Sequence, residues 1–180
     1  MAKIFCFAGM DAINFIDLSE EEIFQVLAFR NHPEISRWMY DASPISLQRH
    51  LQFLENLKHS ASSCYWLFKK EGQALGVGSI TRRNFSHKSA HFGLYKNPNE
   101  RRAGDGILQF LEHIAFDHLG LHSVVLEVME ENQRAIACYE RNGFVRTGTL
   151  QEYVFVNQQY QDVFIYGKIN PQHSPSCSRD

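Results

Sequence analysis

Two arginines and two closely spaced glycines stand together in the segment Asn99-Glu-Arg-Arg-Ala-Gly-Asp-Gly-Ile-Leu108. Gly104 and Gly106 let the backbone turn tightly and leave no Cβ in front of a helix start. Backbone N–H groups at a helix start favour negative charge, and Arg101 and Arg102 add charged donors. The segment predicts a pyrophosphate cradle, with a glycine-assisted turn and solvated arginines as the alternative. It is not a P-loop, because no Gly-Lys-Ser/Thr follows, and its GxGxxG pattern is incomplete.

The spacing of apolar residues on either side of this segment indicates the helices and strands that would position the cradle. A predicted strand, Ser89–Lys96, precedes the cradle, and a helix from Asp105 to about His118 follows it. An apolar strand over Ser123–Met129 and a short helix over Asn132–Arg141 come next. That helix ends at Asn142-Gly143, where glycine fits the positive φ after a helix.

The remaining segments complete an α/β pattern. Ser19 and Glu22 form a capping box at the start of a helix that ends before Asn31-His32-Pro33. Strands are expected near the N-terminus and over 64–69, 74–81, 144–150 and 162–169, and further helices over 33–39 and from Ser46 onward. This order predicts an α/β sandwich around a mixed sheet. We expect one domain over residues 1–170 and a flexible tail over 171–180.

Composition narrows the class of protein. The chain has 180 residues, 44% of them hydrophobic, and a formal net charge of -2, so it has enough apolar material for one core and no global positive field. We therefore expect neither nucleic acid nor a membrane as partner. The four cysteines show no metal-ligand spacing and the histidines no ligand triad, so no metal is predicted and the cytoplasm is the expected compartment.

Two motifs resemble those of a known family. Arg101-Arg-Ala-Gly-Asp-Gly106 is similar to the Q/R-x-x-G-x-G/A signature of the GNAT acetyltransferases, and Asn132-Gln-Arg-Ala-Ile-Ala-Cys-Tyr-Glu-Arg-Asn-Gly-Phe144 resembles their second motif. The motifs follow the family order and spacing, and the resemblance covers roughly residues 4–170. It implies the GNAT acyl-CoA N-acyltransferase fold, with a mostly antiparallel sheet that is flanked by helices and opens between two splayed strands.

The resemblance also implies acetyl-CoA as co-substrate. Backbone groups near Phe92, Gly93 and Leu94 would bond the pantetheine arm, and Gly93 is expected to lie at a bulge with close backbone approach. The cradle would hold the pyrophosphate through Arg101, Arg102, Ala103, Gly104, Asp105, Gly106 and Ile107. Asn132 is expected to cap its helix and also to bond the cofactor's amide arm.

Two residues are the expected catalytic groups for direct transfer. Tyr139 would protonate the departing thiolate, although a half-buried aromatic with a hydrated hydroxyl is the plainer interpretation. Glu127 would act as the base, directly or through water, because a carboxylate in an apolar strand is costly to bury unpartnered. Alternation along the strand would instead place it at a solvated edge. Cys138 is expected to point into the core, so no acyl-cysteine step is predicted.

A closer resemblance narrows the acceptor. The segments Phe29–Tyr40 and Ile45–His50 resemble the N-acetyltransferases of pseudaminic-acid biosynthesis, a route to flagellin glycosylation. These enzymes acetylate the 4-amino group of a UDP-linked 4-amino-4,6-dideoxy-N-acetyl-altrosamine. The resemblance implies an acceptor pocket made by Arg30, His50, Thr81, Arg82 and Tyr95, with Trp38 or Tyr40 stacking on uracil or sugar.

Other acceptors and another class of protein stay open. A polyamine acceptor predicts a pocket rich in carboxylates, whereas the segments here are basic. A ribosomal-protein N-terminus predicts an open groove with no pocket for a base. A non-catalytic acyl-CoA-binding module predicts cofactor binding without turnover. A homodimer is also expected, because the C-terminal strands of this fold often pair between chains.

Overall fold

The computed structural model describes residues 4–156 and 158–173. Its elements in chain order are β1 (Ile4–Phe7), β2 (Met10–Asn14), a 3₁₀ turn (Phe15–Asp17), α1 (Glu20–Asn31), α2 (Pro33–Ser36), α3 (Leu47–Lys58), β3 (Cys64–Lys70), β4 (Gln73–Asn84), β5 (Ser89–Lys96), α4 (Ala103–His113), a π-helical turn (Ile114–His118), β6 (Ser123–Met129), α5 (Gln133–Arg141), β7 (Val145–Val156), β8 (Gln159–Ile169) and a 3₁₀ turn (Pro171–His173). The expected tail beyond this last turn, residues 174–180, lies outside the described residues.

The strands form a single eight-stranded sheet in the order β1-β2-β3-β4-β5-β6-β8-β7. Among the described strands, β5 and β6 are the one parallel pair and all other neighbours are antiparallel. The predicted mixed, mostly antiparallel sheet is therefore confirmed. The N-terminus differs from expectation, because it is a hairpin of two strands rather than one strand.

Helices cover both faces of the sheet. On one face, α4 lies so close to β4 that a Cβ at Gly78 would stand 2.9 Å from a methyl carbon of Leu111. This face holds the larger core, which includes Trp66 and Phe68 of β3 and Phe110 of α4. On the other face, a smaller core joins Val26 of α1 to neighbours from α3, β3 and β4.

Local signals fix the ends of several helices. The Ser19 hydroxyl accepts from the Glu22 backbone N–H and the Glu22 carboxylate accepts from the Ser19 N–H, as the capping box predicts. Asn132 caps α5 by accepting from the Ala135 N–H, and Gly143 has a φ of 77° after that helix. The helix after the cradle begins at Ala103, two residues earlier than expected.

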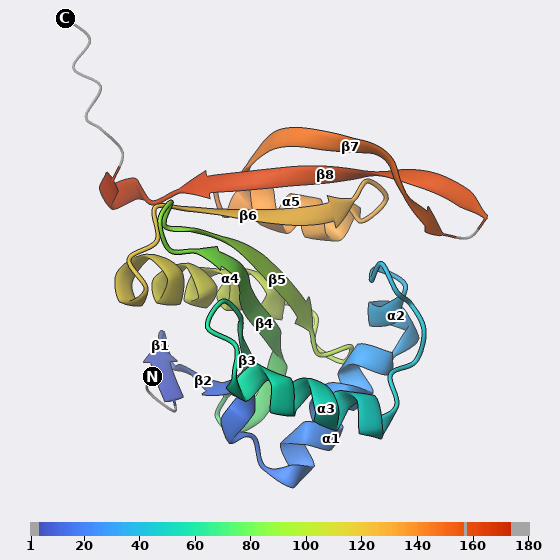
Figure 1. Ribbon diagram of the computed structural model, residues 1–180, viewed down its shortest axis with the longest axis vertical. Helices are drawn as coiled ribbons and strands as arrows, with labels where there is room; N and C mark the ends of the chain where they lie inside the picture. The colour runs from blue at the N-terminus through green and yellow to red at the C-terminus, as the bar shows by residue number, and fades with distance from the viewer. Residues whose placement is uncertain (1–3, 157, 174–180) are drawn as a thin grey trace, which may run out of the picture.

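The sheet opens between its two halves at the parallel pair. β5 and β6 pair only through Ser89–His91 and Ser123–Val125. Beyond that point β5 continues along β4 and β6 continues along β8, so β5 and β6 diverge. Figure 1 shows β6, β7 and β8 running together while β5 turns away from them. The expected splayed strands are confirmed.

One expectation about β5 is wrong. The pairing of β4 and β5 is regular at Ser79 and Gly93, and the irregularity lies between Thr81 and Asn84. Gly93 is therefore not at a bulge. The close approach expected there does exist, because a Cβ at Gly93 would stand 2.8 Å from the Ser79 hydroxyl oxygen.

Candidate active site

A cleft of about 830 Å³ occupies the opening between the diverging strands and extends to α1, α2 and α3. From β5 it is lined by Phe92, Gly93, Leu94 and Tyr95, and from β6 by Glu127, Val128 and Met129. The three cofactor-binding residues predicted on β5 thus lie where the two halves of the sheet separate. Backbone groups on this edge of β5 have no neighbouring strand beyond His91.

One end of the cleft is basic. Arg101, Arg102 and Gly104 line it from the segment before and at the start of α4, and Arg134 and Arg141 line it from α5. Within the part of the chain that the structure describes, no side chain caps the N-terminus of α4, so the N–H groups of its first turn are open to a ligand. Free N–H groups beside arginines suit a phosphate or diphosphate, which is what the cradle predicts. The arginines from α5 were not predicted as part of it.

The structure separates the predicted cradle residues into two groups. Arg101, Arg102, Gly104, Asp105 and Asn132 line the cleft. Ala103 and Ile107 are buried in the larger core, and a Cβ at Gly106 would face Met10. The side chains of these three residues therefore face packing partners, which leaves their backbone groups as what they can offer a ligand.

Glu127 lies at the centre of a polar cluster in the cleft. Its carboxylate accepts a hydrogen bond from the Tyr40 hydroxyl at 2.5 Å and lies 3.5 Å from an Arg82 guanidinium nitrogen. The Nδ1 atom of His91 is 3.8 Å away. The side chain is 20% exposed, so Glu127 is partnered and also open to the cleft. Burial, followed by the bond to Glu127, raises the pKa of Tyr40 well above its usual 10, which keeps this hydroxyl a donor.

Tyr139 is buried at 7% exposure and lines the cleft from α5. Its ring packs near Phe144 and Tyr166, and no hydrogen bond to its hydroxyl is found among residues 4–156 and 158–173. Burial, with a smaller effect from Cys138, raises the pKa of Tyr139 well above its usual 10. The phenol therefore holds its proton at neutral pH and has it available for a leaving group.

Cys138 packs into the core, as expected, although it also borders the cleft. It is buried in the larger core beside Asp105. Burial and the Asp105 carboxylate raise the pKa of Cys138 to about 12, so the thiol stays protonated and is a poor nucleophile.

The other end of the cleft holds four of the predicted acceptor residues. Arg30, Trp38, His50 and Tyr95 all line it. Arg30 Nη1 and His50 Nε2 are buried and have no hydrogen-bond partner among the residues that the structure describes, so both atoms have unused hydrogen-bonding capacity. Burial lowers the pKa of His50, which makes the neutral imidazole the stable form at pH 7. Tyr95 also stays protonated, because burial raises its pKa.

The predicted Thr81–Arg82 pair lies outside this lining. The Thr81 hydroxyl donates to the His91 carbonyl oxygen at 3.5 Å, and the mostly exposed Arg82 reaches the cleft only through Glu127. Sequence reasoning missed Ser79, which lines the cleft beneath Gly93. It also gave Tyr40 a stacking role, whereas the hydroxyl of Tyr40 bonds Glu127.

In the described ranges, 4–156 and 158–173, no group of three or more His, Cys, Asp or Glu side chains is arranged to hold a metal ion. None of the helices in these ranges has the length and apolar character needed to span a bilayer.

Among the described strands, the sheet opens beside its one parallel pair, with a basic helix start at one end of the opening, which is the arrangement that the resemblance to the acyl-CoA N-acyltransferases implied. The chain belongs to the acetyltransferase (GNAT) family, whose model matches residues 28–144. It is therefore an acetyl-CoA-dependent N-acetyltransferase, and the expected fold, class of enzyme and co-substrate are confirmed.

Relatives with three different names resemble this chain, among them a ribosomal-protein-serine acetyltransferase of Escherichia coli that is 32% identical over 104 residues, 56% of this chain and 57% of the relative. The chain is 33% identical to acetyltransferase PseH of Campylobacter jejuni over 131 residues, which are 73% of this chain and 82% of the relative. It is 37% identical to spermidine N(1)-acetyltransferase of Vibrio cholerae over 93 residues, 49% of this chain and 53% of the relative.

Solved structures include members of two of these groups. The Vibrio cholerae spermidine N-acetyltransferase in complex with CoA and spermine superposes with a TM-score of 0.83 at 21% identity, covering 91% of this chain and 97% of that one. The Campylobacter jejuni PseH complex with acetyl coenzyme A gives 0.69 at 24% identity, covering 89% and 98%. At these identities the superpositions establish the fold and leave the acceptor open.

Proposed function

We propose that this enzyme transfers the acetyl group of acetyl-CoA to the 4-amino group of a UDP-4-amino-4,6-dideoxy-N-acetyl-altrosamine-type sugar, in pseudaminic-acid biosynthesis and flagellin glycosylation. The observation that carries the proposal is the pair of buried, unpartnered atoms Arg30 Nη1 and His50 Nε2 in the acceptor end of the cleft. A guanidinium and a neutral imidazole match a phosphate and a hydroxyl. The resemblance to PseH, an enzyme of that pathway, supports the same acceptor.

Charge in the acceptor end argues against a polyamine. Arg30, Arg37 and Arg49 line this end, against the two carboxylates Glu34 and Glu127. Glu127 is already paired with Arg82 and bonded to Tyr40. A polycation would lie beside guanidinium groups, whereas a diphosphate would be attracted to them.

The co-substrate is proposed to lie in the opening of the sheet. Backbone groups of Phe92, Gly93 and Leu94 would hold its pantetheine arm, and Arg101, Arg102 and the first N–H groups of α4 would hold its pyrophosphate. Asn132 has its side-chain oxygen engaged in the helix cap, which leaves its amide nitrogen for the cofactor's amide arm. Bound there, acetyl-CoA supplies the thioester that the amine attacks.

The proton movements are assigned to two residues. Glu127 accepts the proton that the amine loses when it forms the new C–N bond. Tyr139 donates its phenolic proton to the sulfur when the C–S bond breaks. The raised pKa of Tyr139 keeps the phenol protonated at neutral pH, so its O–H can face the sulfur as a proton donor when the C–S bond breaks. Transfer is direct, without an acetyl group on Cys138.

An acceptor screen tests the proposal. Purified enzyme is given acetyl-CoA with UDP-4-amino-4,6-dideoxy sugars, spermidine or ribosomal-protein N-terminal peptides, and the release of free thiol is followed. Turnover of the UDP-sugar above the others is expected. Arg30→Ala should raise the KM for the UDP-sugar about 10-fold or more, because a charged hydrogen bond is lost, and leave the KM for acetyl-CoA near wild type. Lys58→Ala on the exposed side of α3 is the control.

The same screen separates the alternatives. Preference for spermidine would make the chain a polyamine acetyltransferase, and preference for a peptide would make it a protein N-acetyltransferase. Acetyl-CoA binding by calorimetry without turnover of any acceptor would identify a non-catalytic binding module. We also propose that residues 1–170 form one catalytic domain, that the enzyme is cytoplasmic and that it forms a homodimer.

A further inference from the structure

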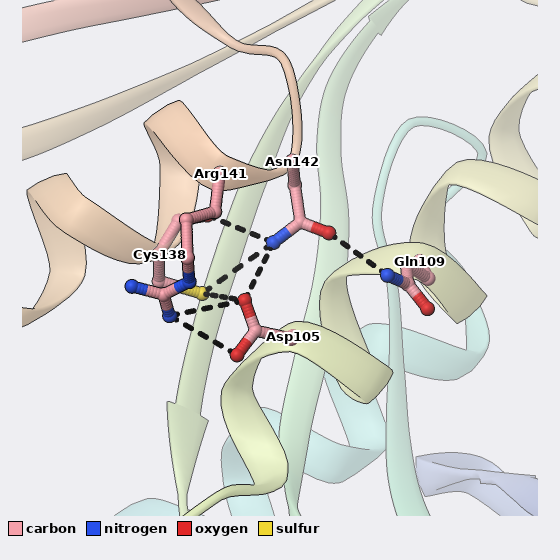
Figure 2. Close-up of polar contacts among 5 residues, drawn as sticks. All are labelled: Asp105, Gln109, Cys138, Arg141 and Asn142. Atoms are coloured by element: carbon pink, nitrogen blue, oxygen red, sulfur yellow. Dashed lines mark hydrogen bonds and ion pairs between the residues drawn. The ribbon is translucent and has the colours of Figure 1, made fainter.

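A polar network joins the start of α4 to the end of α5. The Asp105 carboxylate accepts hydrogen bonds from Asn142 Nδ2 at 2.7 Å, from Arg141 Nη2 at 3.1 Å to each oxygen, and from Cys138 Sγ at 3.5 Å. The Asn142 amide also donates to the Cys138 carbonyl oxygen at 2.8 Å. Figure 2 shows these side chains converging on Asp105 from the far side of the gap between the two helices.

The network continues along the same face of α4. Asn142 Oδ1 accepts from Gln109 Nε2 at 3.1 Å. The Lys168 ammonium donates to the Asn142 carbonyl oxygen at 2.7 Å and to Glu112 at 2.6 Å. Residues 105, 109 and 112 follow helical spacing and lie on one face. That face of α4 therefore holds the C-terminal end of α5 at several points, with Asp105 accepting most of the bonds.

The negative charge of Asp105 lies beside the proposed phosphate site, where it would repel an anion unless a cation were paired with it. Asp105 lies in the first turn of α4 and lines the basic end of the cleft. Burial would raise the pKa of Asp105, but the bonds from Arg141, Asn142 and Cys138 outweigh it and hold the pKa below its usual value. With Arg141 paired to it, the carboxylate adds little repulsion toward an anion at the helix start. The carboxylate itself is occupied by protein groups rather than available to a cofactor.

The position of α5 determines the position of Tyr139. Its hydroxyl has no hydrogen-bond partner within the described ranges 4–156 and 158–173, so no polar contact fixes it from the protein side. The nine residues of α5 are too few to be stable as an isolated helix, so neighbouring elements must hold it. Cys138 and Arg141, which bond Asp105, flank Tyr139 on that helix.

We propose that Asp105 is a positioning residue for the transfer step, which holds α5 and therefore the Tyr139 hydroxyl at a fixed place relative to the phosphate-binding start of α4. This inference rests on the proposed acid role of Tyr139. The carboxylate of Asp105 thus bonds α5, while Asp105 stays a predicted residue of the cradle. The backbone N–H groups of the first turn keep the cradle role.

A double-mutant cycle tests this role. Asp105→Ala should lower kcat about 10- to 100-fold, because small displacements of a catalytic group have effects of this size, while the calorimetric Kd for acetyl-CoA changes less than about threefold. In a Tyr139→Phe background the same substitution should lower kcat by less than about twofold, because residues that act as a unit are not additive. Asp105→Asn, which keeps an acceptor for Asn142, should recover part of kcat.

The controls distinguish the possible failures. Glu55→Ala removes an exposed carboxylate paired with Lys58 and should leave kcat unchanged in both backgrounds. Equal losses from Asp105→Ala in both backgrounds would overturn the positioning role, as would loss of acetyl-CoA affinity at unchanged kcat. If Asp105→Ala does not fold, the cycle is run with Asp105→Asn. A wild-type kcat for Tyr139→Phe alone would instead refute the proposed acid, a separate result.

Discussion

The Tyr40 hydroxyl donates a hydrogen bond to the Glu127 carboxylate at 2.5 Å, although the two residues are 87 positions apart in the sequence. The bond joins the segment between α2 and α3 to the middle of β6, across the acceptor end of the cleft. Tyr40 also packs edge-on against Tyr153 of β7 at 5.8 Å between ring centroids. The proposed base is therefore oriented by a residue from the acceptor side.

Removing that hydroxyl should slow transfer. We expect Tyr40→Phe to lower kcat about 10-fold, since a hydrogen bond to a charged group typically contributes about that factor, with acetyl-CoA binding unchanged. Steady-state kinetics and calorimetry measure the two quantities. Tyr153→Phe keeps the ring contact and leaves the Glu127 bond intact, so it is the matched control. Equal kinetics for the two variants would mean that the Tyr40 bond does not orient Glu127 in the working enzyme.

Tyr139→Phe should lower kcat about 100-fold or more, the usual contribution of a general acid, with little change in the Kd for acetyl-CoA. In the wild type the raised pKa of Tyr139 keeps the phenol protonated above pH 10, the usual value. We therefore expect no alkaline fall in kcat from this group up to about pH 10. A fall centred near pH 8 or 9 that disappears in Tyr139→Phe would contradict the direction of the shift.

His50 should make folding stability depend on pH. Burial lowers its pKa below the ordinary 6.5, so the unfolded chain binds a proton more readily than the folded one. The stabilisation is present above pH 6.5 and is lost as the pH falls. His50→Gln should flatten part of the decline in the free energy of unfolding between about pH 7 and pH 5, measured by urea titration. His59→Gln changes an exposed histidine and should leave that slope unchanged.

Gly104→Val should block binding of acetyl-CoA. The added Cβ would stand 3.4 Å from Cys138 Sγ, and the branched methyl groups would extend at the helix start that lines the cleft. We expect an increase in Kd of at least about 10-fold, equivalent to about 1.4 kcal/mol of binding free energy, because the methyl groups would take space that the pyrophosphate needs. Gly106→Ala adds a methyl group on the same helix turn that would stand 3.4 Å from Met10, so it shows the effect of a side chain that faces the core rather than the cleft. Unchanged calorimetric binding by Gly104→Val would rule out the cradle.

Much of the fold could be predicted because its signals are local. Capping residues and apolar periodicity marked α1, α3 and α5, and the apolar run of β6 marked a buried strand. The missed strand, β2, follows a two-residue turn in which Ala8 has a φ of 51° and Gly9 a φ of 74°. Such turns usually carry Asn-Gly or Asp-Gly, so alanine at the first position concealed the hairpin.

Motifs that fix the backbone allowed the cradle and Tyr139 to be proposed from the sequence, whereas contacts between side chains far apart in the sequence gave no such signal. The cradle and Tyr139 follow from motifs that the GNAT fold repeats. The partners of Glu127 come from three other segments, which supply Tyr40, Arg82 and His91. The contacts of the Asp105 carboxylate depend on where the C-terminal end of α5 lies relative to α4. Residue spacing within one segment does not predict that arrangement.

Among the described residues, only three register pairs join β5 of the five-stranded half of the sheet to β6 of the three-stranded half, with two more backbone bonds to the Lys88 carbonyl oxygen beside them. Because the strands contribute so few contacts, the resistance to bending between β5 and β6 must come largely from the packed helices α4 and α5. An extended molecule inserted in the gap would take the place of the neighbouring strand that β5 lacks beyond His91. Binding energy from the far end of such a molecule would then be converted directly into rigidity around the reacting atoms.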